Sequence, residues 1–312
     1  MSYKHLFGPV ASRRLGVSLG VDIMPSKVCN LNCIYCECGS TTTLSVERRE
    51  WVPAAEVIAE LSDFLAQSPR LDVVTVTGSG EPTLNTGLGT IIKFLKKNHP
   101  RYATALLTNG TLFTLPEVRK AASLFDYVLP SLDAVSPDVF TKVNRPHGGL
   151  DNKKIIKGLA RFGREYKGAL WLEVFIVPGI NDSAEDLLFL KKAINEIGPG
   201  RVQLNTLDRP GACDSVKPAS AERLIEIADF FKPLTVEILS RQYAAPAPLL
   251  AGSGLESAIL ATLRRRPSTI EDLSSATGQL INDVTVILSR LVTSNKVKTK
   301  TVKSKIFYKT VC

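Results

Sequence analysis

Three cysteines near the start of the chain have the spacing of a metal-binding loop. Cys29, Cys33 and Cys36 are separated by three and then two residues, so their thiolates can converge on one centre from a single loop. A structural zinc site takes four ligands and no second pair is visible, although Cys38 could complete a zinc loop. Thiolates also hold iron–sulfur clusters, and three cysteines can hold a [4Fe–4S] cluster with one iron open. We favour the cluster over zinc and over incidental buried thiols.

A glycine-rich turn follows the second candidate strand. Thr77–Pro82 has the sequence TGSGEP, and glycines there let the backbone approach a ligand closely. Glu81 can accept hydrogen bonds from an ammonium group, and Pro82 fixes the turn that follows. Thr108–Gly110, with the sequence TNG, ends the third candidate strand in a similar way. Each segment taken alone could be only a turn between a strand and a helix.

Other polar residues are candidates for contact with a substrate. Glu173 lies among apolar residues of the fifth candidate strand, and a lone acid pointing into a barrel is more often a ligand contact than not. His147 could contact a substrate, transfer a proton, or lie on the surface. Arginines that could bind a carboxylate or phosphate, or form ordinary ion pairs, are Arg13, Arg14, Arg145 and Arg209.

Strand-like and helix-like segments alternate along most of the chain and would position these residues. The candidate strands are Gly16–Met24, Asp72–Thr77, Ala103–Thr108, Tyr127–Leu132, Leu170–Val177 and Arg201–Thr206. The candidate helices between them are Pro53–Gln67, Leu88–Asn98, Pro116–Leu124, Asp151–Tyr166, Ala184–Ile197 and Ala219–Phe231. This alternation indicates parallel βα units, coiled into a barrel or laid out as an open sheet. In both arrangements the chemistry belongs at the carboxyl ends of the strands.

The two motifs together resemble those of the radical S-adenosylmethionine (SAM) superfamily, over residues 15–240. The resemblance rests on the three-cysteine loop, on Tyr35 before its last cysteine, and on the Gly-x-Gly-Glu-Pro turn about one βα unit later. It implies an α/β fold, a partial (β/α)6 TIM-type barrel. It also implies that Cys29, Cys33 and Cys36 ligate a [4Fe–4S] cluster whose open iron is chelated by SAM.

The resemblance also implies a reaction. SAM is cleaved reductively to methionine and a 5′-deoxyadenosyl radical, which abstracts hydrogen from a substrate. By correspondence with the family, SAM contacts fall on Gly78, Gly80, Glu81, Asn109, Ser131, Asp133 and Asn205. The first three rest on the motif, and the others on their places at strand ends. The catalytic residue stays open, with His147, Glu173 and Arg145 as candidates. The expected electron donor is a reduced flavodoxin or ferredoxin-type protein.

Further segments are similar to an uncharacterised cytosolic branch near the wyosine-base and molybdenum-cofactor enzymes. They include Phe7–Gly16, with the sequence FGPVASRRLG, and Asn144–His147, with the sequence NRPH. That branch supplies no substrate, so an RNA nucleobase, a small molecule and a peptide all stay open.

A second part of the chain follows a segment that contains two prolines and two glycines. We expect a barrel domain over residues 1–243, a linker over 244–254 and a small domain over 255–312. The small domain resembles a winged helix-turn-helix. Its expected elements are Leu255–Arg265, a helix opened by a capping box at Ser268–Glu271, Leu280–Ser294, and the strands Lys296–Thr301 and Lys305–Thr310. Because the cofactor motifs precede the linker, we expect this domain to be dispensable for SAM cleavage.

Positive charge is concentrated in this small domain. The whole chain has a net charge of +9, and residues 255–312 hold ten lysines and arginines but only four acids. Lys296, Lys298 and Lys300 could bind a nucleic-acid backbone without reading its sequence, and a role in protein contact or as a substrate lid is comparable. A different class of function is an iron–sulfur regulator that binds DNA through this domain. The intact glycine turn argues against it, since a sensor has no need to hold SAM.

Composition excludes several classes of protein. The chain has 312 residues, of which 44% are hydrophobic and 22% charged, so it is not a disordered chain. It has no apolar run of about 18 residues that could span a membrane, and its start lacks an apolar signal core, so we expect a cytoplasmic protein. The cysteines do not form a disulfide framework. A second cluster at Cys38, Cys213 and Cys312 has no compact motif to support it.

Overall fold

An eight-stranded sheet forms the main body of the protein. The computed structural model describes residues 3–12, 14–239, 254–302 and 305–311. The sheet has the order β1-β2-β5-β6-β7-β8-β9-β10, with β1 antiparallel to β2 and the other neighbours parallel. The strands are β1 Leu6–Ser12, β2 Gly16–Asp22, β5 Val73–Thr77, β6 Ala103–Thr108, β7 Tyr127–Pro130, β8 Ala169–Phe175, β9 Arg201–Asn205 and β10 Val236–Ile238.

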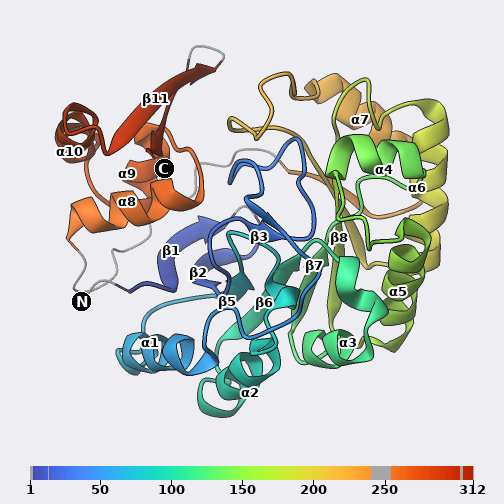
Figure 1. Ribbon diagram of the computed structural model, residues 1–312, viewed down its shortest axis with the longest axis horizontal. Coiled ribbons are helices and arrows are strands. Elements are labelled where there is room, and N and C mark those ends of the chain that lie inside the picture. Colours follow the sequence, from blue (N-terminus) through green and yellow to red (C-terminus); the bar gives the residue numbers. More distant parts are fainter. Residues whose placement is uncertain (1–2, 13, 240–253, 303–304, 312) are drawn as a thin grey trace.

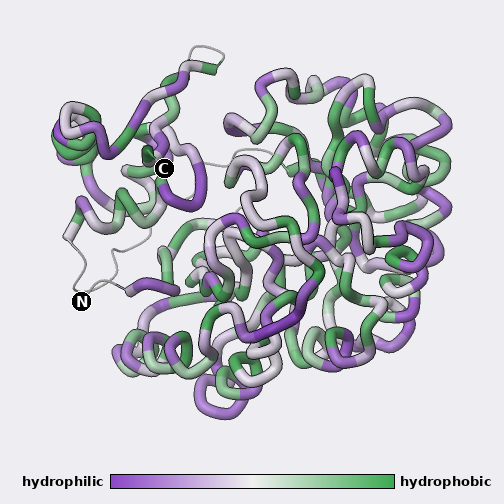
Figure 2. The backbone as a smooth tube through the Cα atoms, viewed as in Figure 1, coloured by the Kyte–Doolittle hydropathy of each residue, from purple (hydrophilic) through white to green (hydrophobic). Residues whose placement is uncertain are grey.

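Helices cover the outer face of this sheet (Figure 1). They are α1 Ala54–Ala66, α2 Leu88–Asn98, α3 Pro116–Ala122, α4 Pro137–Asn144, α5 Asn152–Glu165, α6 Ala184–Ile197 and α7 Ala221–Phe230, with short 3-10 turns at Pro82–Leu84 and Thr111–Thr114. In α5, apolar residues such as Ile155, Leu159 and Phe162 are buried, and the Asp151 side chain caps the helix by accepting from the Lys153 and Lys154 amides. Hydrophobic and hydrophilic residues alternate along these helices (Figure 2).

The two faces of the sheet bury different residues because side chains alternate along each strand. On β5, Val74 and Val76 belong to the main core beneath the helices. Val73 belongs instead to a small apolar cluster with Ala105 and Leu129. Thr75 and Thr77 share the face of Val73, so the inner face is apolar at one end and polar toward the carboxyl edge. This mixed α/β fold with its parallel strands is consistent with the expected partial barrel.

The six expected strands and six expected helices of this region are present, within two residues at each end. The sequence did not indicate β1, α4 or β10. β1 contains Gly8 and Pro9, which are joined by a cis bond. Glycine and proline are both uncommon inside strands, so these two residues weaken the sequence signal of a strand. α4 and β10 are short, with eight and three residues, so neither shows a full period.

Three helices and a hairpin make up residues 254–311, which we call the C-terminal part. They are α8 Leu255–Arg265, α9 Ile270–Thr277, α10 Ile281–Thr293, β11 Val297–Val302 and β12 Lys305–Thr310. The capping box lies one residue later than expected, because Thr269 and Asp272 form it. The part has its own apolar core, which includes Leu263 and Leu288. The linker predicted at 244–254 lies outside the described residues except for Gly254.

The C-terminal part packs against the first strand of the sheet. α8 and α9 both contact β1, and Figure 1 places them beside that strand. β1 is an edge strand with β2 as its sheet neighbour, so the helices cover an edge that would otherwise be open. In the parts of the chain that the structure describes, no helix is both long and apolar enough to cross a lipid bilayer.

Candidate active site

The three cysteines lie in a loop that begins at a short strand. β3 (Val28–Cys29) pairs with β4 (Thr43–Leu44), and the loop between them carries Cys33 and Cys36. The end of α4 fixes the loop through its backbone: the Asn32 amide donates to the Asn144 carbonyl at 2.9 Å, and the Ile34 amide to the Val143 carbonyl at 3.0 Å. Strand pairing and backbone bonds thus hold the loop in place.

Each of the three thiols has a polar donor beside it. The Asn109 amide nitrogen lies 3.7 Å from Cys29 Sγ, the Asn144 amide nitrogen 3.4 Å from Cys33 Sγ, and Lys27 Nζ 3.6 Å from Cys36 Sγ. Such donors favour a charged thiolate, which is the form that binds metal.

Burial acts against thiolate formation at two of the cysteines. Burial, together with the charge of Glu81, raises the pKa of Cys29 to about 12. Burial also raises the pKa of Cys33. At Cys36 a hydrogen bond from the Cys38 thiol outweighs burial and, with the charge of Lys27, lowers the pKa to about 6. A bound cation would supply the positive charge that Cys29 and Cys33 lack.

The donor set fits a cluster better than a single ion. Within residues 3–12, 14–239, 254–302 and 305–311, no three histidine, cysteine or acidic side chains stand close enough together to hold one metal ion. An iron–sulfur cube is wider than one ion, so its cysteine ligands stand further apart. The all-thiolate donor set is the kind that such clusters take. The zinc loop completed by Cys38 is therefore not what this geometry favours.

Tyr35 joins the cysteine loop to the far strands of the sheet. Its ring stacks on Phe175 at 3.8 Å between centroids, and its hydroxyl donates to Asp133 Oδ2 at 2.5 Å. Asp133 also accepts from the Asn144 amide at 2.8 Å and from the Phe175 backbone amide at 2.9 Å. Burial raises the pKa of Asp133 to about 6. Because its two oxygens accept these three hydrogen bonds, Asp133 holds the cysteine loop in position.

The glycine turn lies directly against the start of the cysteine loop. A Cβ added to Gly80 would stand 1.8 Å from the Val28 carbonyl oxygen, so only glycine fits there. The Glu81 amide donates to that carbonyl at 3.1 Å, and the Lys27 amide donates to the Ser79 carbonyl at 3.0 Å. The two motifs therefore form one layer at the carboxyl edge of β5.

Glu81 is a support of this layer, with both carboxylate oxygens already engaged. Its Oε1 accepts from the Thr83 amide at 2.9 Å and from the hydroxyls of Thr83 and Thr108 at 2.5 and 2.6 Å. Its Oε2 accepts from the Asn109 amide at 2.7 Å. The side chain is 2% exposed, and burial raises its pKa. These bonds hold Glu81 to the surrounding loops, and its contact with the ammonium group of SAM stays a prediction.

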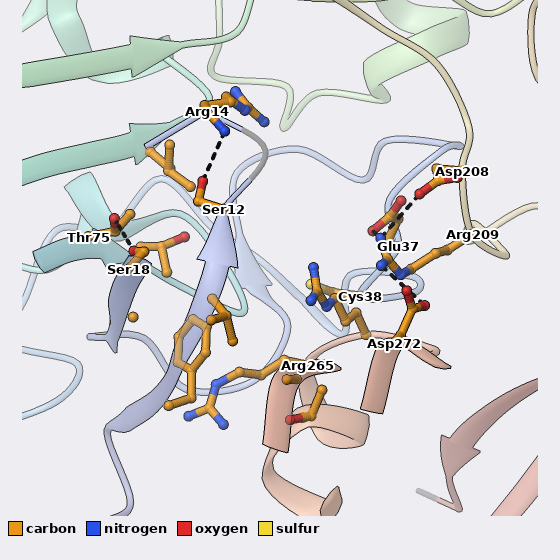
Figure 3. A pocket seen from close by; sticks show the side chains of 18 of the residues that line it. Ser12, Arg14, Ser18, Glu37, Cys38, Thr75, Asp208, Arg209, Arg265 and Asp272 are labelled. Atoms are coloured by element: carbon orange, nitrogen blue, oxygen red, sulfur yellow. Dashed lines mark hydrogen bonds and ion pairs between the residues drawn. The ribbon is translucent and has the colours of Figure 1, made fainter. Parts of the chain in front are cut away.

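A cavity of about 500 Å³ opens beside this layer. The predicted residues that line it are Gly78, Glu173, Asn205, Arg14 and Arg209, together with Cys36 of the cysteine loop. Its lining comes from β1, β2, β5, β6, β8 and β9, so the inner face of the sheet curves around it. Figure 3 shows its polar side chains.

An ion pair crosses the inner end of this cavity. Arg14 Nη2 lies 2.5 Å from Glu173 Oε2, and Arg14 Nη1 donates to Gln203 Oε1 at 3.2 Å. Both side chains of the pair are 15% exposed. Ser18 and Thr75 share a hydrogen bond of 2.7 Å nearby (Figure 3). The lone acid expected on the fifth strand thus has as its partner one of the arginines that the sequence offers as a candidate.

Other predicted residues do not line the cavity. His147 and Arg145 follow α4, and their backbones pair with the cysteine loop at Asn30 and Asn32. The Arg145 side chain is exposed. Among the strand-end residues, the Asn109 side chain bonds to Asn30 at 2.7 Å. Ser131 forms a bridge with Glu173 through its backbone. These residues lie near the carboxyl edge of the sheet, but none of them lines the cavity.

Asp22 and Arg265 also line the cavity, although neither is among the candidates that the sequence indicates. Asp22, at the end of β2, accepts from the Ser79 amide at 3.0 Å and from the Ser79 hydroxyl at 2.5 Å. An acid near the end of the first expected strand is the signal that could have found it. Arg265 of α8 reaches the same aspartate, with Nε 3.5 Å from Asp22 Oδ2. In the sequence, Arg265 stands out only as part of the basic charge of the C-terminal part.

Comparison with known proteins gives the family. The model of the radical SAM superfamily matches residues 23–190. A UPF0026 protein of Helicobacter pylori strain J99 is 39% identical over 270 residues, which are 86% of this chain and 86% of that protein.

Two further matches are informative about extent and fold. A protein named GTPase Obg from Brachyspira hyodysenteriae is 35% identical over 98% of this chain, but the match covers only 45% of that relative. This chain therefore spans less than half the length of that relative. The solved structure of TYW1 with a lysine-pyruvate adduct bound has a TM-score of 0.52 at 17% identity, covering 73% of this chain and 76% of that one, a similarity of fold alone. Taken with the superfamily match over more than half of the chain and the UPF0026 relative, these findings show that the chain belongs to the radical SAM superfamily and, within it, to the UPF0026 proteins.

Proposed function

We propose that this protein is a radical SAM enzyme that cleaves SAM reductively and abstracts hydrogen from a substrate bound in the cavity between the sheet and the C-terminal part. One observation carries the proposal. The three-cysteine loop packs against the glycine turn through the contact of Gly80 with Val28, and the cavity opens beside both. Superfamily membership supports SAM-dependent radical chemistry in general, with a [4Fe–4S] cluster and SAM as its cofactors.

In this proposal Cys29, Cys33 and Cys36 hold the cluster. A cluster held there would supply the electron that the reductive cleavage of SAM requires. Asn109, Asn144 and Lys27 donate toward the three sulfurs and stabilise them as thiolates. Glu81 and Asp133 keep the two loops in place through the hydrogen bonds described above.

The backbone of the glycine turn is proposed to bind the methionyl end of SAM. Gly78 lines the cavity, and the contact of Gly80 with Val28 leaves no room for a side chain between the turn and the cysteine loop. Asn205 of β9 also lines the cavity and is proposed to contact the adenosyl end. The protein's part is to orient both reactants and to exclude water and stray hydrogen donors.

For substrate contact we propose Arg14 and Glu173 at the inner end of the cavity. The two side chains neutralise each other, so a neutral polar substrate can meet a donor and an acceptor there without leaving an uncompensated buried charge. His147 and Arg145 are weaker candidates, because neither lines this cavity.

The experiment that tests the function is direct. Full-length protein, reconstituted anaerobically and reduced with dithionite, is incubated with SAM, and 5′-deoxyadenosine is measured by liquid chromatography. We expect slow formation in the absence of substrate, and none in the Cys33→Ala variant. A wild-type protein that holds its cluster and still releases no 5′-deoxyadenosine would contradict the proposal.

Two partners are proposed with it. A reduced flavodoxin or ferredoxin-type protein would supply the electron. The second is a nucleic acid, which would bind to the basic hairpin. Two of the predicted lysines already have acidic neighbours there, because Lys296 lies 3.6 Å from Glu256 and Lys300 pairs with Asp214. Lys298 and Lys305 stay exposed and carry this prediction.

An iron–sulfur regulator that reads DNA is less well supported. The helix that would enter the groove is α10, and it and its N-cap residue expose apolar side chains, with Leu280 73%, Ile281 50% and Val286 59% exposed. Apolar side chains of this kind cannot pair with the donors and acceptors of base edges.

A further inference from the structure

The cavity beside the cofactor loops has walls from two separate parts of the chain. The sheet and the cysteine loop supply most of it, and α8 and α9 supply the rest with Thr262, Arg265, Arg266, Glu271, Asp272 and Ala276. Figure 3 shows Arg265 and Asp272 on these helices, facing residues of the sheet and of the cysteine loop. The C-terminal part is therefore part of the cavity's surface in this structure.

Arg209 joins the two walls at the cysteine loop. It follows β9 and is 6% exposed. Its Nη2 lies 3.3 Å from Asp272 Oδ2 of α9, and its Nη1 lies 3.6 Å from Glu37 Oε2, between Cys36 and Cys38. One guanidinium thus contacts both the C-terminal part and the loop that carries the cysteines (Figure 3).

Arg265 makes a second such connection at the glycine turn. Its Nε lies 3.5 Å from Asp22 Oδ2, and Asp22 holds the backbone amide of Ser79 at 3.0 Å. The Arg265 guanidinium also lies over the Phe7 ring of β1, 4.4 Å from its centroid. Ion pairs therefore link the C-terminal part to residues beside the cysteine loop and beside the glycine turn.

Arg209 retains an unused donor. Its Nε is buried and has no hydrogen-bond acceptor among the residues that the structure describes, although the side chain lines the cavity. A buried donor without a partner is costly unless a ligand or water supplies an acceptor. The remaining nitrogens of Arg209 are held by Glu37, Asp208 and Asp272, which fixes the direction in which Nε points.

We propose that the C-terminal part is a wall of the substrate site, seated by Arg209 and Arg265, and that the site encloses a small molecule with an acceptor oxygen beside Arg209. Calling it the substrate site rests on the proposed function. The cavity of about 500 Å³ would hold SAM as well in the proposed function, so the space left for the substrate suits a small molecule. The acceptor can be a carbonyl, carboxylate or phosphate oxygen, since each of these accepts from Nε.

Hydrogen exchange of the full-length chain, followed by mass spectrometry, tests the wall. The variant is the double substitution Arg209→Gln and Arg265→Gln, and the control is Arg161→Gln, which removes an exposed pair with Glu165 on α5. We expect the double variant to exchange roughly tenfold faster in peptides from β1, α8 and α9, with α5 unchanged. If the double variant misfolds, which faster exchange in α5 would reveal, the single variants Arg209→Gln and Arg265→Gln are measured instead. Wild-type exchange at β1 and α9 in a folded variant would overturn the proposal.

The ligand is tested with acetate, inorganic phosphate and acetamide as probes. At least one of them should protect the peptide that contains Arg209 in the wild type and in Arg161→Gln, and not in Arg209→Gln. If none protects it, the acceptor-oxygen ligand is wrong. A single-stranded oligonucleotide that protects the cavity-lining peptides better than every probe would overturn the assignment of an enclosed small molecule.

These readouts do not depend on the cluster. Exchange is also measured on protein without the cluster. If the protein does not cleave SAM, the wall and the role of its arginines still hold, but the cavity can no longer be called a substrate site. Conversely, SAM cleavage with unchanged exchange in the folded double variant retains the enzyme and overturns the wall.

Discussion

Glu81 is a motif residue whose carboxylate bonds extensively to the loops around it. Its carboxylate is buried and accepts from two hydroxyls and two backbone amides of the surrounding loops. Asp133 plays a similar part for Tyr35 and Asn144. Buried carboxylates that accept several hydrogen bonds fix the backbone around them, because each donor would otherwise be left unsatisfied. At the residue scale, then, the two acids hold the cysteine loop and the glycine turn in place.

Replacing Glu81 by alanine should damage the glycine turn. The change leaves the Thr108 hydroxyl and the Asn109 amide without an acceptor, and we expect the unfolding free energy to fall by about 3 kcal/mol. Denaturant unfolding measures the loss, and SAM affinity should fall with it because the turn loses its shape. Glu81→Gln keeps one acceptor oxygen and should cost clearly less. Equal stability of the alanine variant and the wild type would show that these hydrogen bonds contribute nothing.

Substitution of the cysteines separates ligands from neighbours. Cys29→Ala, Cys33→Ala or Cys36→Ala should each prevent reconstitution of a cluster with about four irons, seen as loss of the brown absorbance. Cys38→Ala should keep the cluster, since Cys38 acts on Cys36 through a hydrogen bond. The comparison requires all four variants under the same anaerobic conditions. A full iron content in any of the first three would remove that residue from the ligand set.

At the scale of elements, β1 determines how the C-terminal part is seated. β1 is an edge strand with a register irregularity between Phe7 and Val10, and α8 and α9 pack on it. Phe7 receives the Arg265 guanidinium on its ring. An edge strand covered by helices is protected from pairing with other chains, so the packing also guards against aggregation.

Removal of the C-terminal part should therefore be harmful, in contrast to the expectation from motif positions alone. A chain ending at residue 252 leaves Arg209 without Asp272 and Asp22 without Arg265, and it exposes the apolar residues of β1. We expect its Tm to fall by about 5 °C or more, with a tendency to aggregate. Differential scanning calorimetry of both chains measures the effect. An unchanged Tm and full SAM cleavage would restore the view of a dispensable domain.

For the molecule as a whole, charge is divided between the two parts. The C-terminal part carries most of the excess positive charge, but Lys300 pairs with Asp214 and Lys296 lies close to Glu256. On the hairpin, Lys298 faces Lys309 directly across the two strands, an unfavourable pair that an anionic partner would relieve. The hairpin thus retains part of the basic surface that the sequence indicated.

If the hairpin recruits a nucleic acid, binding should depend steeply on salt. Phosphate contacts release counterions, so the affinity of the full-length protein for single-stranded RNA should drop as potassium chloride rises. Lys298→Glu with Lys305→Glu should weaken binding to all sequences alike, whereas Lys232→Glu on the sheet part serves as the matched control. Fluorescence anisotropy measures both effects. If the affinity does not change with salt concentration, or if no tested RNA binds, the proposal of a nucleic-acid partner is wrong.

The sequence by itself determined the chemistry and the order of the elements. The spacing of three cysteines and the glycine turn are local features, and hydrophobic periodicity is local too, so the order of residues along the chain is enough to recognise them. Six strands and six helices followed correctly from it. β1 was not recognisable in this way, because its glycine and proline weaken the sequence signal of a strand. The strand is held in place by its pairing with β2 and by the helices α8 and α9.

Only the tertiary structure decided which polar residues meet. Arg14 and Glu173 are 159 positions apart, and Arg265 and Asp22 are 243 apart, so no periodicity or motif relates them. The fold also placed loop donors around Glu81 and Asp133, which the sequence indicated only as possible ligand contacts. The packing of the C-terminal part on β1 likewise depends on contacts between residues far apart in the sequence. The positions of the motifs carry no information about such contacts, so they suggested a separable domain. In the folded chain this part lines the cavity.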